Sequence, residues 1–214
     1  MDRATQLAGA TVVERGQQPR PRGAFEIVAF AASAGGLQAL SQVLAAIPRE
    51  FPAAIVVVQH LDPRHRSLMA DILNKRTAIP VRQAQEGDLL APGTAYIAPP
   101  NRHLLVNPDA TLSLSQSELV HFVRPSADLL FESTAASYKD RAIAVVLSGT
   151  GSDGAMGVRA IKKMGGTVIV QDQRTSLFYG MPDAAVHTGS VDFVLPVDEI
   201  PPALVTLVAN RDAT

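Results

Sequence analysis

The chain has 214 residues, of which 47% are hydrophobic, and a formal net charge of −1. This length suffices for one large domain with a sizeable core, and the charge gives no electrostatic case for nucleic acid as a partner. The absence of cysteine excludes disulfides, thiolate metal sites and cysteine nucleophiles, and it suits a reducing cytoplasm. No apolar stretch nears the roughly 20 residues that a membrane-spanning helix needs, so no membrane insertion is expected.

The first 24 residues differ in composition from the rest of the chain. Residues 15–23 are polar, rich in arginine and proline, and have no hydrophobic period. They also lack the continuous apolar core of a secretory signal. We therefore expect residues 1–24 to form a disordered N-terminal tail and residues 25–214 to form one folded domain.

Strands and helices are predicted to alternate in the first part of this domain. Continuous apolar runs predict buried strands, and apolar residues at helical spacing predict helices. The expected order is strand 25–32, helix 37–47, strand 53–58 and helix 63–73. Short strands at 79–81 and 94–98 follow, and then a hairpin formed by 103–106 and 111–114 around the turn signal Asn107-Pro-Asp-Ala110.

The second part returns to alternating elements. The expected order is a helix from a cap at Ser126 to about Tyr138, strand 141–147, helix 155–164, strand 167–170, helix 182–186, strand 190–195 and a last helix that includes 204–208. Continuous apolar strands between helices indicate a doubly wound α/β domain with a mainly parallel sheet and an antiparallel hairpin at one edge. Active sites of such domains lie at the carboxyl ends of the strands.

A glycine-rich turn, Gly149-Thr-Gly-Ser-Asp-Gly154, follows the strand at 141–147. Its spacing is G-x-G-x-x-G, and Asp172 stands about where a ribose-binding acid would follow, so dinucleotide binding is one interpretation. Against it, the carboxylate of Asp153 would face the pyrophosphate at the helix N-terminus. A tight turn with a capping aspartate is the second interpretation. The third is a catalytic Asp153, held by the N–H groups of the turn and by a histidine.

Ser33, His60 and Asp153 each follow a predicted parallel strand. Because these strand ends open on one edge of the sheet, the three can act as nucleophile, general base and orienting carboxylate. Ala31 and Gly35 leave the space that a nucleophile on a sharp strand-to-helix turn needs. Each residue also has a structural interpretation, Ser33 as a helix N-cap and His60 as a satisfied buried histidine. No histidine pair has metal-ligand spacing near carboxylates, so no metal site and no cofactor are expected.

Five spaced motifs carry a resemblance to a known family. They are VAFAASAGGL at 28–37, VVQHLDP at 57–63, RPS at 124–126, LSGTGSDG at 147–154 and YGMP at 179–182. Together, in register from about residue 25 to 210, they resemble the catalytic domain of CheB, the chemotaxis protein-glutamate methylesterase. The sequences SAGG and QHLDP within these motifs most resemble the form of the domain that is fused to a receptor methyltransferase.

The resemblance implies that residues 25–214 are a cytoplasmic methylesterase catalytic domain with the triad Ser33, His60 and Asp153. The reaction would be hydrolysis of glutamate γ-methyl esters on chemoreceptor helices, with release of methanol. Some members also deamidate receptor glutamines. The partners implied are methylated chemoreceptor helices and a separate regulator or methyltransferase, with no nucleic acid.

The same resemblance assigns roles around the nucleophile. Backbone N–H groups of Ala34, Gly35 and Thr150 would hold the oxyanion, and Met181 is expected to contact the substrate. Many members have threonine in place of Ala34 and methionine in place of Thr150. At Ala34 any contribution of a hydroxyl is absent, whereas at Thr150 a backbone donor should tolerate the change of side chain.

One departure from the family and two alternative functions remain open at this point. Well-known members carry an N-terminal receiver domain, which 24 residues cannot form, so control by aspartate phosphorylation within this chain is in doubt. A serine esterase of the same fold could act on another ester with the same residues. The second alternative is a non-catalytic signalling module, against which the intact triad argues.

Overall fold

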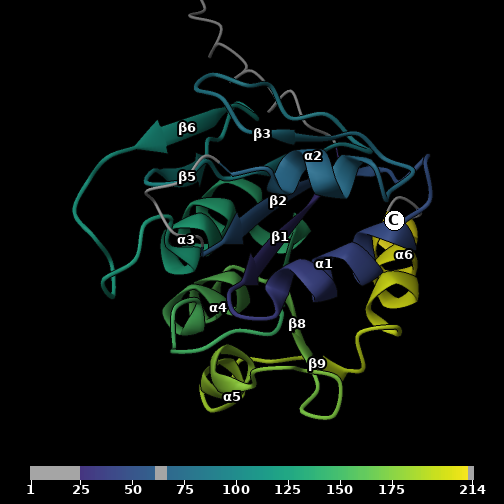
Figure 1. The fold of residues 1–214 in the computed structure, drawn as a ribbon, viewed down its shortest axis with the longest axis vertical. Coiled ribbons are helices and arrows are strands. Elements are labelled where there is room, and N and C mark those ends of the chain that lie inside the picture. Colours follow the sequence, from purple (N-terminus) through teal and green to yellow (C-terminus); the bar gives the residue numbers. More distant parts are fainter. Residues whose placement is uncertain (1–24, 61–66, 212–214) are drawn as a thin grey trace, which may run out of the picture.

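A twisted sheet of seven parallel strands forms the centre of the molecule (Figure 1). The structure is a computed structural model, and it describes residues 25–60 and 67–211. The strand order is β3-β4-β2-β1-β7-β8-β9, and every neighbouring pair is parallel. The strands are β1 Glu26–Ala32, β2 Ala53–Gln59, β3 Val81–Gln83, β4 Ala95–Ile97, β7 Ala142–Val146, β8 Thr167–Gln171 and β9 Phe193–Leu195.

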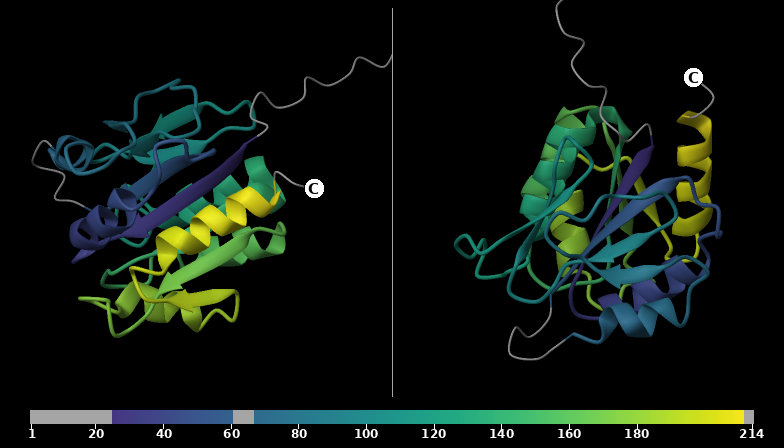
Figure 2. Two further views of the ribbon diagram at one scale, coloured as in Figure 1. Left: turned by 90° about the vertical axis from the view of Figure 1, so that its right-hand side faces the viewer. Right: turned by 90° about the horizontal axis from the view of Figure 1, so that it is seen from above.

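Six α-helices in the described part of the chain cover the two faces of this sheet (Figures 1 and 2). One face is packed by α1 Gly36–Ala45, α2 Met69–Asn74 and α6 Ile200–Arg211, and the other by α3 Ala127–Tyr138, α4 Ala155–Lys163 and α5 Gly180–Val186. Successive strand residues alternate between two buried clusters because side chains of a strand point to opposite faces. The doubly wound α/β prediction is thus confirmed.

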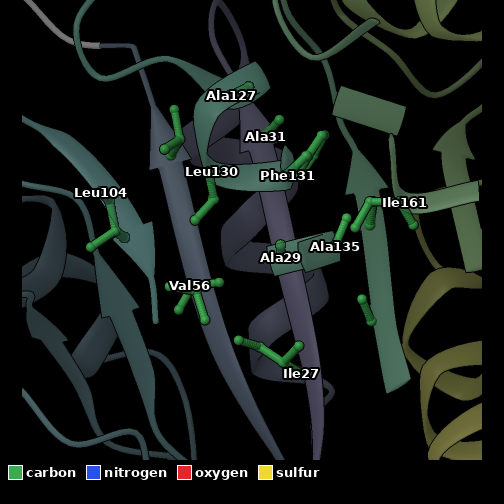
Figure 3. Close-up of a cluster of buried hydrophobic side chains, with 14 of the residues drawn as sticks. Ile27, Ala29, Ala31, Val56, Leu104, Ala127, Leu130, Phe131, Ala135 and Ile161 are labelled. Carbon is green, nitrogen blue, oxygen red and sulfur yellow. The ribbon is translucent and has the colours of Figure 1, made fainter. Parts of the chain in front are cut away.

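The central strands are apolar on both faces, which explains their continuous hydrophobic runs. Every residue of β1 and β2 is buried. Figure 3 shows Ala29 and Ala31 of β1 and Val56 of β2 against Leu130 and Phe131 of α3. Small residues on β1 let α3 lie close to the sheet, so the N-terminus of α3 reaches the strand ends.

The order in which strands are added to the sheet reverses between the neighbouring parallel strands β1 and β7. The strand β2 lies on the outer side of β1, and β8 lies on the outer side of β7, toward the opposite edge of the sheet. The helices that follow, α1 and α4, pack on opposite faces. Such a switch point opens a crevice at the carboxyl edge, where ligands of open α/β sheets bind. Ser33 and the glycine-rich turn flank this crevice.

The predicted hairpin forms a small sheet of its own. Strands β5 His103–Val106 and β6 Leu112–Ser115 pair only with each other within the described residues, and β5 packs against α3. The hairpin is joined to the chain beyond β3 by an isolated bridge between Leu89 and Thr111 and by backbone hydrogen bonds between residues 87–90 and 110–112. The hairpin therefore supports α3 rather than extending the large sheet.

Several predicted boundaries are wrong. The helix expected over 63–73 is observed only as α2 from Met69, and Ser67 and Leu68 precede it; residues 61–66 lie outside the described residues, as does the predicted tail 1–24. The helix expected from Pro182 begins at Gly180, because a proline in the first helical turn needs no N–H partner. The last strand is shorter than predicted, at Phe193–Leu195. No helix in the described part is long and apolar enough to cross a membrane.

Candidate active site

Ser33 and His60 occupy equivalent places on neighbouring strands. Ala32 of β1 is paired in register with Gln59 of β2, so the next residue of each strand lies at the carboxyl edge. The N–H of His60 donates to the carbonyl oxygen of Ala32 at 3.1 Å, and the N–H of Ser33 donates to the carbonyl oxygen of Ser148 at 3.0 Å. The ends of β1, β2 and β7 are thereby tied together, with Ser33 in the middle.

Gln59 holds the backbone at both positions, a role that the sequence analysis missed. Its buried side-chain amide donates to the carbonyl oxygens of Ser33 at 2.7 Å and of His60 at 3.0 Å. Gly36 leaves room for this amide, because a side chain there would overlap it. The available signal was a polar residue at the end of an otherwise apolar strand.

Asp153 makes the contact with His60 that its position predicts. Its Oδ2 lies 2.8 Å from Nε2 of His60, and the two side chains are 4% and 14% exposed. The structure thus brings together a histidine and an aspartate that are 93 residues apart in the chain. The pair lies in the shielded surroundings that strengthen a charge-assisted hydrogen bond.

The remaining partners of Asp153 differ from the expectation. Its carboxylate is held by the N-terminus of α3 rather than by N–H groups of its own turn. The N–H of Ala127 donates to Oδ2 at 2.6 Å, the N–H of Asp128 to Oδ1 at 3.1 Å, and the Ser126 hydroxyl to Oδ1 at 2.9 Å. An anion is stabilised there because the first N–H groups of a helix have no partners within it.

These contacts decide the charge on Asp153 and the tautomer of His60. Burial raises the pKa of the Asp153 carboxyl, but the hydrogen bonds from His60, Ala127 and Asp128 outweigh burial, and the pKa lies below its usual value. An ionised carboxylate only accepts hydrogen bonds, so Nε2 of His60 carries the proton. Nδ1 is the ring nitrogen left to accept a proton from another group.

Asp128 makes the reciprocal contact between α3 and α4. Its Oδ1 accepts from the N–H of Gly157 in the first turn of α4 at 2.7 Å, and its Oδ2 lies 3.2 Å from Nε2 of His121. Asp153 precedes α4 and binds α3, whereas Asp128 belongs to α3 and binds α4. Burial raises the pKa of the Asp128 carboxyl, and the nearby charge of Asp153 raises it further. The orientation of Asp153 is thus fixed from both helices.

A second serine and histidine lie beside Asp153 but are enclosed. Ser126 and His103 are 0% exposed. The N–H of Ser126 donates to Nδ1 of His103 at 3.1 Å, and Nε2 of His103 donates to the carbonyl oxygen of Glu118 at 3.0 Å. Burial lowers the pKa of His103, which keeps the ring neutral. Ser126 therefore serves as the predicted N-cap of α3 and as a donor to Asp153, with its side chain out of reach of a substrate.

The proposed oxyanion donors have no acceptor among the residues that the structure describes. Within residues 25–60 and 67–211, the N–H groups of Ala34, Gly35 and Thr150 make no hydrogen bond. Ala34 and Gly35 lie immediately before α1, and Gly35 adopts a φ of +75° as its N-cap. A Cβ on Gly35 would come within 2.7 Å of the Ser148 hydroxyl, so the close turn requires glycine. Free N–H groups at a helix N-terminus favour a negative charge near Ser33.

Met181 packs beneath the glycine turn. It is 1% exposed, and a Cβ on Gly149 would overlap its sulfur and lie 3.0 Å from Cβ of Ser33. Gly149 therefore has to be glycine for Ser33 and Met181 to lie on either side of it. The role of Met181 in substrate contact stays a prediction.

The surroundings of the turn argue against dinucleotide binding. A Cβ on Gly180 would lie 3.1 to 3.2 Å from backbone atoms of Gly149, Thr150 and Gly151, so the start of α5 packs directly on the turn. The carboxylate of Asp172 accepts from the N–H and hydroxyl of Thr175 at 2.9 and 2.6 Å. The glycine turn is thus covered by α5, and Asp172 is engaged by Thr175. Among the described residues, no group of three or more histidine or acidic side chains is placed to hold a metal ion.

Comparison with known proteins agrees with this geometry. Residues 28–204 match the family model described as CheB methylesterase. The chain is 43% identical over 208 residues to a protein-glutamate methylesterase/protein-glutamine glutaminase of Moorella thermoacetica, covering 95% of this chain and 49% of that protein. It is 40% identical over 187 residues to a putative protein of the same name from Leptospira interrogans, covering 87% and 97%.

A solved structure shows the same fold. The crystal structure of the Thermotoga maritima CheB methylesterase catalytic domain is 37% identical, has a TM-score of 0.83, and is matched over 86% of this chain and 99% of that one. The chain spans about half the length of the Moorella protein and nearly all of the Leptospira and Thermotoga chains. On the family match and these identities, the chain belongs to the CheB methylesterase family.

Proposed function

We propose that this chain is a serine esterase that removes methyl groups from glutamate γ-methyl esters of chemoreceptors and releases methanol. The observation that carries the proposal is the 2.8 Å contact of His60 with an anchored, ionised Asp153, next to Ser33 on the adjacent strand. Its relatives from Moorella and Leptospira bear the name of this activity. Because Nε2 of His60 donates to Asp153, Nδ1 is the nitrogen that can serve as the general base for a serine nucleophile.

The proposed reaction has two halves. In the first, Nδ1 of His60 takes the proton of the Ser33 hydroxyl as Oγ attacks the ester carbonyl, and the N–H groups of Ala34, Gly35 and Thr150 bind the oxyanion. The C–O bond to the methoxy group then breaks, and methanol leaves with the proton from His60. In the second, His60 takes a proton from water as the water attacks the acyl-enzyme, and it passes this proton to Oγ of Ser33 as the acyl–Oγ bond breaks and the glutamate leaves.

Three further assignments belong to the same proposal. Deamidation of receptor glutamines is supported by the shared acyl-transfer route, with ammonia in place of methanol, and by the names of the relatives. A relation to the methyltransferase-fused form is supported by SAGG at 33–36 and QHLDP at 59–63. Action in the cytoplasm, with a separate regulator or methyltransferase as partner, is supported by the match to the family.

The test is methanol release from receptor membranes methylated with a labelled methyl group. Wild-type protein should release labelled methanol, and the Ser33→Ala variant should release none above background. Hydrolysis of p-nitrophenyl acetate is followed in parallel as a measure of esterase chemistry alone. An enzyme that hydrolyses the small ester but leaves the receptor ester untouched would act on another ester, and an active Ser33→Ala variant would exclude Ser33 as the nucleophile.

A further inference from the structure

The segment between β6 and α3 is a protruding loop that is held rigidly at its base. It stands out from the body in Figure 1, left of α3, and again in the right-hand view of Figure 2. The guanidinium of Arg124 donates to the Asn101 side chain at 2.7 and 3.0 Å and to the carbonyl oxygens of Gln116 and Ser117 at 3.0 and 2.7 Å. The two ends of the loop are therefore tied to each other and to Asn101, just before β5.

The end of this loop, residues 120–123, is a two-residue hairpin that we call the tip hairpin. The N–H and carbonyl groups of Val120 and Val123 pair in both directions, at 3.2 and 2.9 Å. The two turn residues between them, His121 and Phe122, have φ values of +49° and +65°. Such turns strongly favour asparagine and glycine, because other side chains are strained at positive φ.

The strained turn places an aromatic side chain in solvent. Phe122 is 95% exposed and Leu119, just before the turn, is 53% exposed. A soluble domain gains nothing in stability from holding a phenylalanine outward on a strained backbone, and such strain collects at functional sites. A contact made by Phe122 with another molecule accounts for both features.

The tip hairpin is coupled to the candidate active site. His121 contacts Asp128, and the N–H of Asp128 donates to the carboxylate of Asp153, which binds His60. Phe122 is therefore the neighbour of a residue that is two contacts away from Asp153. Other exposed apolar side chains stand where helices begin at this same edge: Leu37 after Ser33, Met156 after Asp153, and Leu177 before α5.

We propose that the tip hairpin is a docking contact for the receptor helix that carries the methylated glutamate, with Phe122 packing against apolar side chains of that helix. The inference rests on the proposed function. A helix that presents its ester to Ser33 has to cross the carboxyl edge, so its next turns reach the apolar residues around that edge. Phe122 then acts on receptor choice and affinity, without contact to the reacting atoms.

The test separates docking from chemistry with one substitution, Phe122→Gly. Glycine suits the +65° backbone, so the variant should unfold at a Tm equal to or above that of the wild type. Its p-nitrophenyl acetate hydrolysis should stay within twofold of wild type. Methanol release from methylated receptor membranes should fall about tenfold in kcat/KM, through KM. Phe122→Leu keeps an apolar contact and should retain most receptor activity.

Control and binding measurements make each outcome decisive. Phe193→Ala removes another exposed phenylalanine, on the edge strand β9, and should leave both activities unchanged. Sedimentation with receptor membranes measures binding without turnover. It therefore tests the docking role of the tip hairpin even if the wild type releases no methanol and the proposed function fails. Weaker sedimentation of Phe122→Gly supports the proposal. Equal sedimentation, or a parallel loss of small-ester and receptor hydrolysis, overturns it.

Discussion

Two serines lie near Asp153, and removing each hydroxyl should separate catalysis from stability. The hydroxyl of Ser126 donates to the Asp153 carboxylate at 2.9 Å inside the core. A hydrogen bond to a charged group contributes about 1.5–3 kcal/mol. We therefore expect Ser126→Ala to lower the free energy of unfolding by about 1.5–3 kcal/mol.

The activity of Ser126→Ala should survive in large part. The N–H groups of Ala127 and Asp128 and the His60 ring still hold the carboxylate. Even if the whole hydrogen-bond energy were lost from the transition state, turnover would fall by only about ten- to 150-fold. Because three partners remain, a loss near tenfold is expected.

Ser33→Ala should show the reverse behaviour. Within the described residues the Ser33 hydroxyl makes no hydrogen bond, so its removal should change the unfolding free energy by less than about 0.5 kcal/mol. Loss of a serine nucleophile lowers turnover by about three orders of magnitude or more. Urea unfolding and p-nitrophenyl acetate hydrolysis at pH 7 measure the two effects.

A matched control lies on the same helix. Ser133 of α3 accepts from the N–H of Val106 at 3.1 Å, far along the helix from Asp153. Ser133→Ala should lose stability but keep full activity. The reasoning is refuted if Ser126→Ala is as inactive as Ser33→Ala while still folded, since Ser126 would then be the nucleophile.

Three other predictions follow from the site. Asp153→Asn should lower turnover about 10⁴-fold by favouring the wrong imidazole tautomer, with an unchanged circular dichroism spectrum; an active variant would contradict its role. Because the pKa of Asp153 is lowered in the folded protein, the ionised carboxylate stabilises the fold fully above the usual value of 3.8, and this stabilisation is lost as the pH falls through the lower folded value. The free energy of unfolding measured in urea below about pH 4 should therefore depend less on pH in Asp153→Asn than in the wild type. Equal pH dependence of the two proteins would argue against this role. Gly149→Ala should cost about 1–3 kcal/mol by overpacking and should abolish turnover by displacing Ser33, whereas Thr150→Ala should be active, because only its backbone N–H is used; normal turnover in Gly149→Ala would show that the site can shift.

The sequence by itself determined the elements and the edge at which the chemistry lies. Continuous apolar runs predict buried parallel strands, and the residues after three of them are Ser33, His60 and Asp153. That these three residues lie at one edge follows because the carboxyl ends of parallel strands meet at the same edge of a sheet. His60 and Asp153 meet as expected, although their catalytic roles with Ser33 stay predictions.

Tertiary structure alone decided how this edge is held. Hydrophobic periodicity reports which face of an element is buried, but not which element lies beside it. The carboxylate of Asp153 is bound by the N-terminus of α3, some 25 residues earlier in the chain, and Gln59 ties the backbone of Ser33 to that of His60. These contacts depend on the strand order and on how closely α3 packs against β1. No local pattern encodes either of these, because both arise when the two faces of the sheet are covered together.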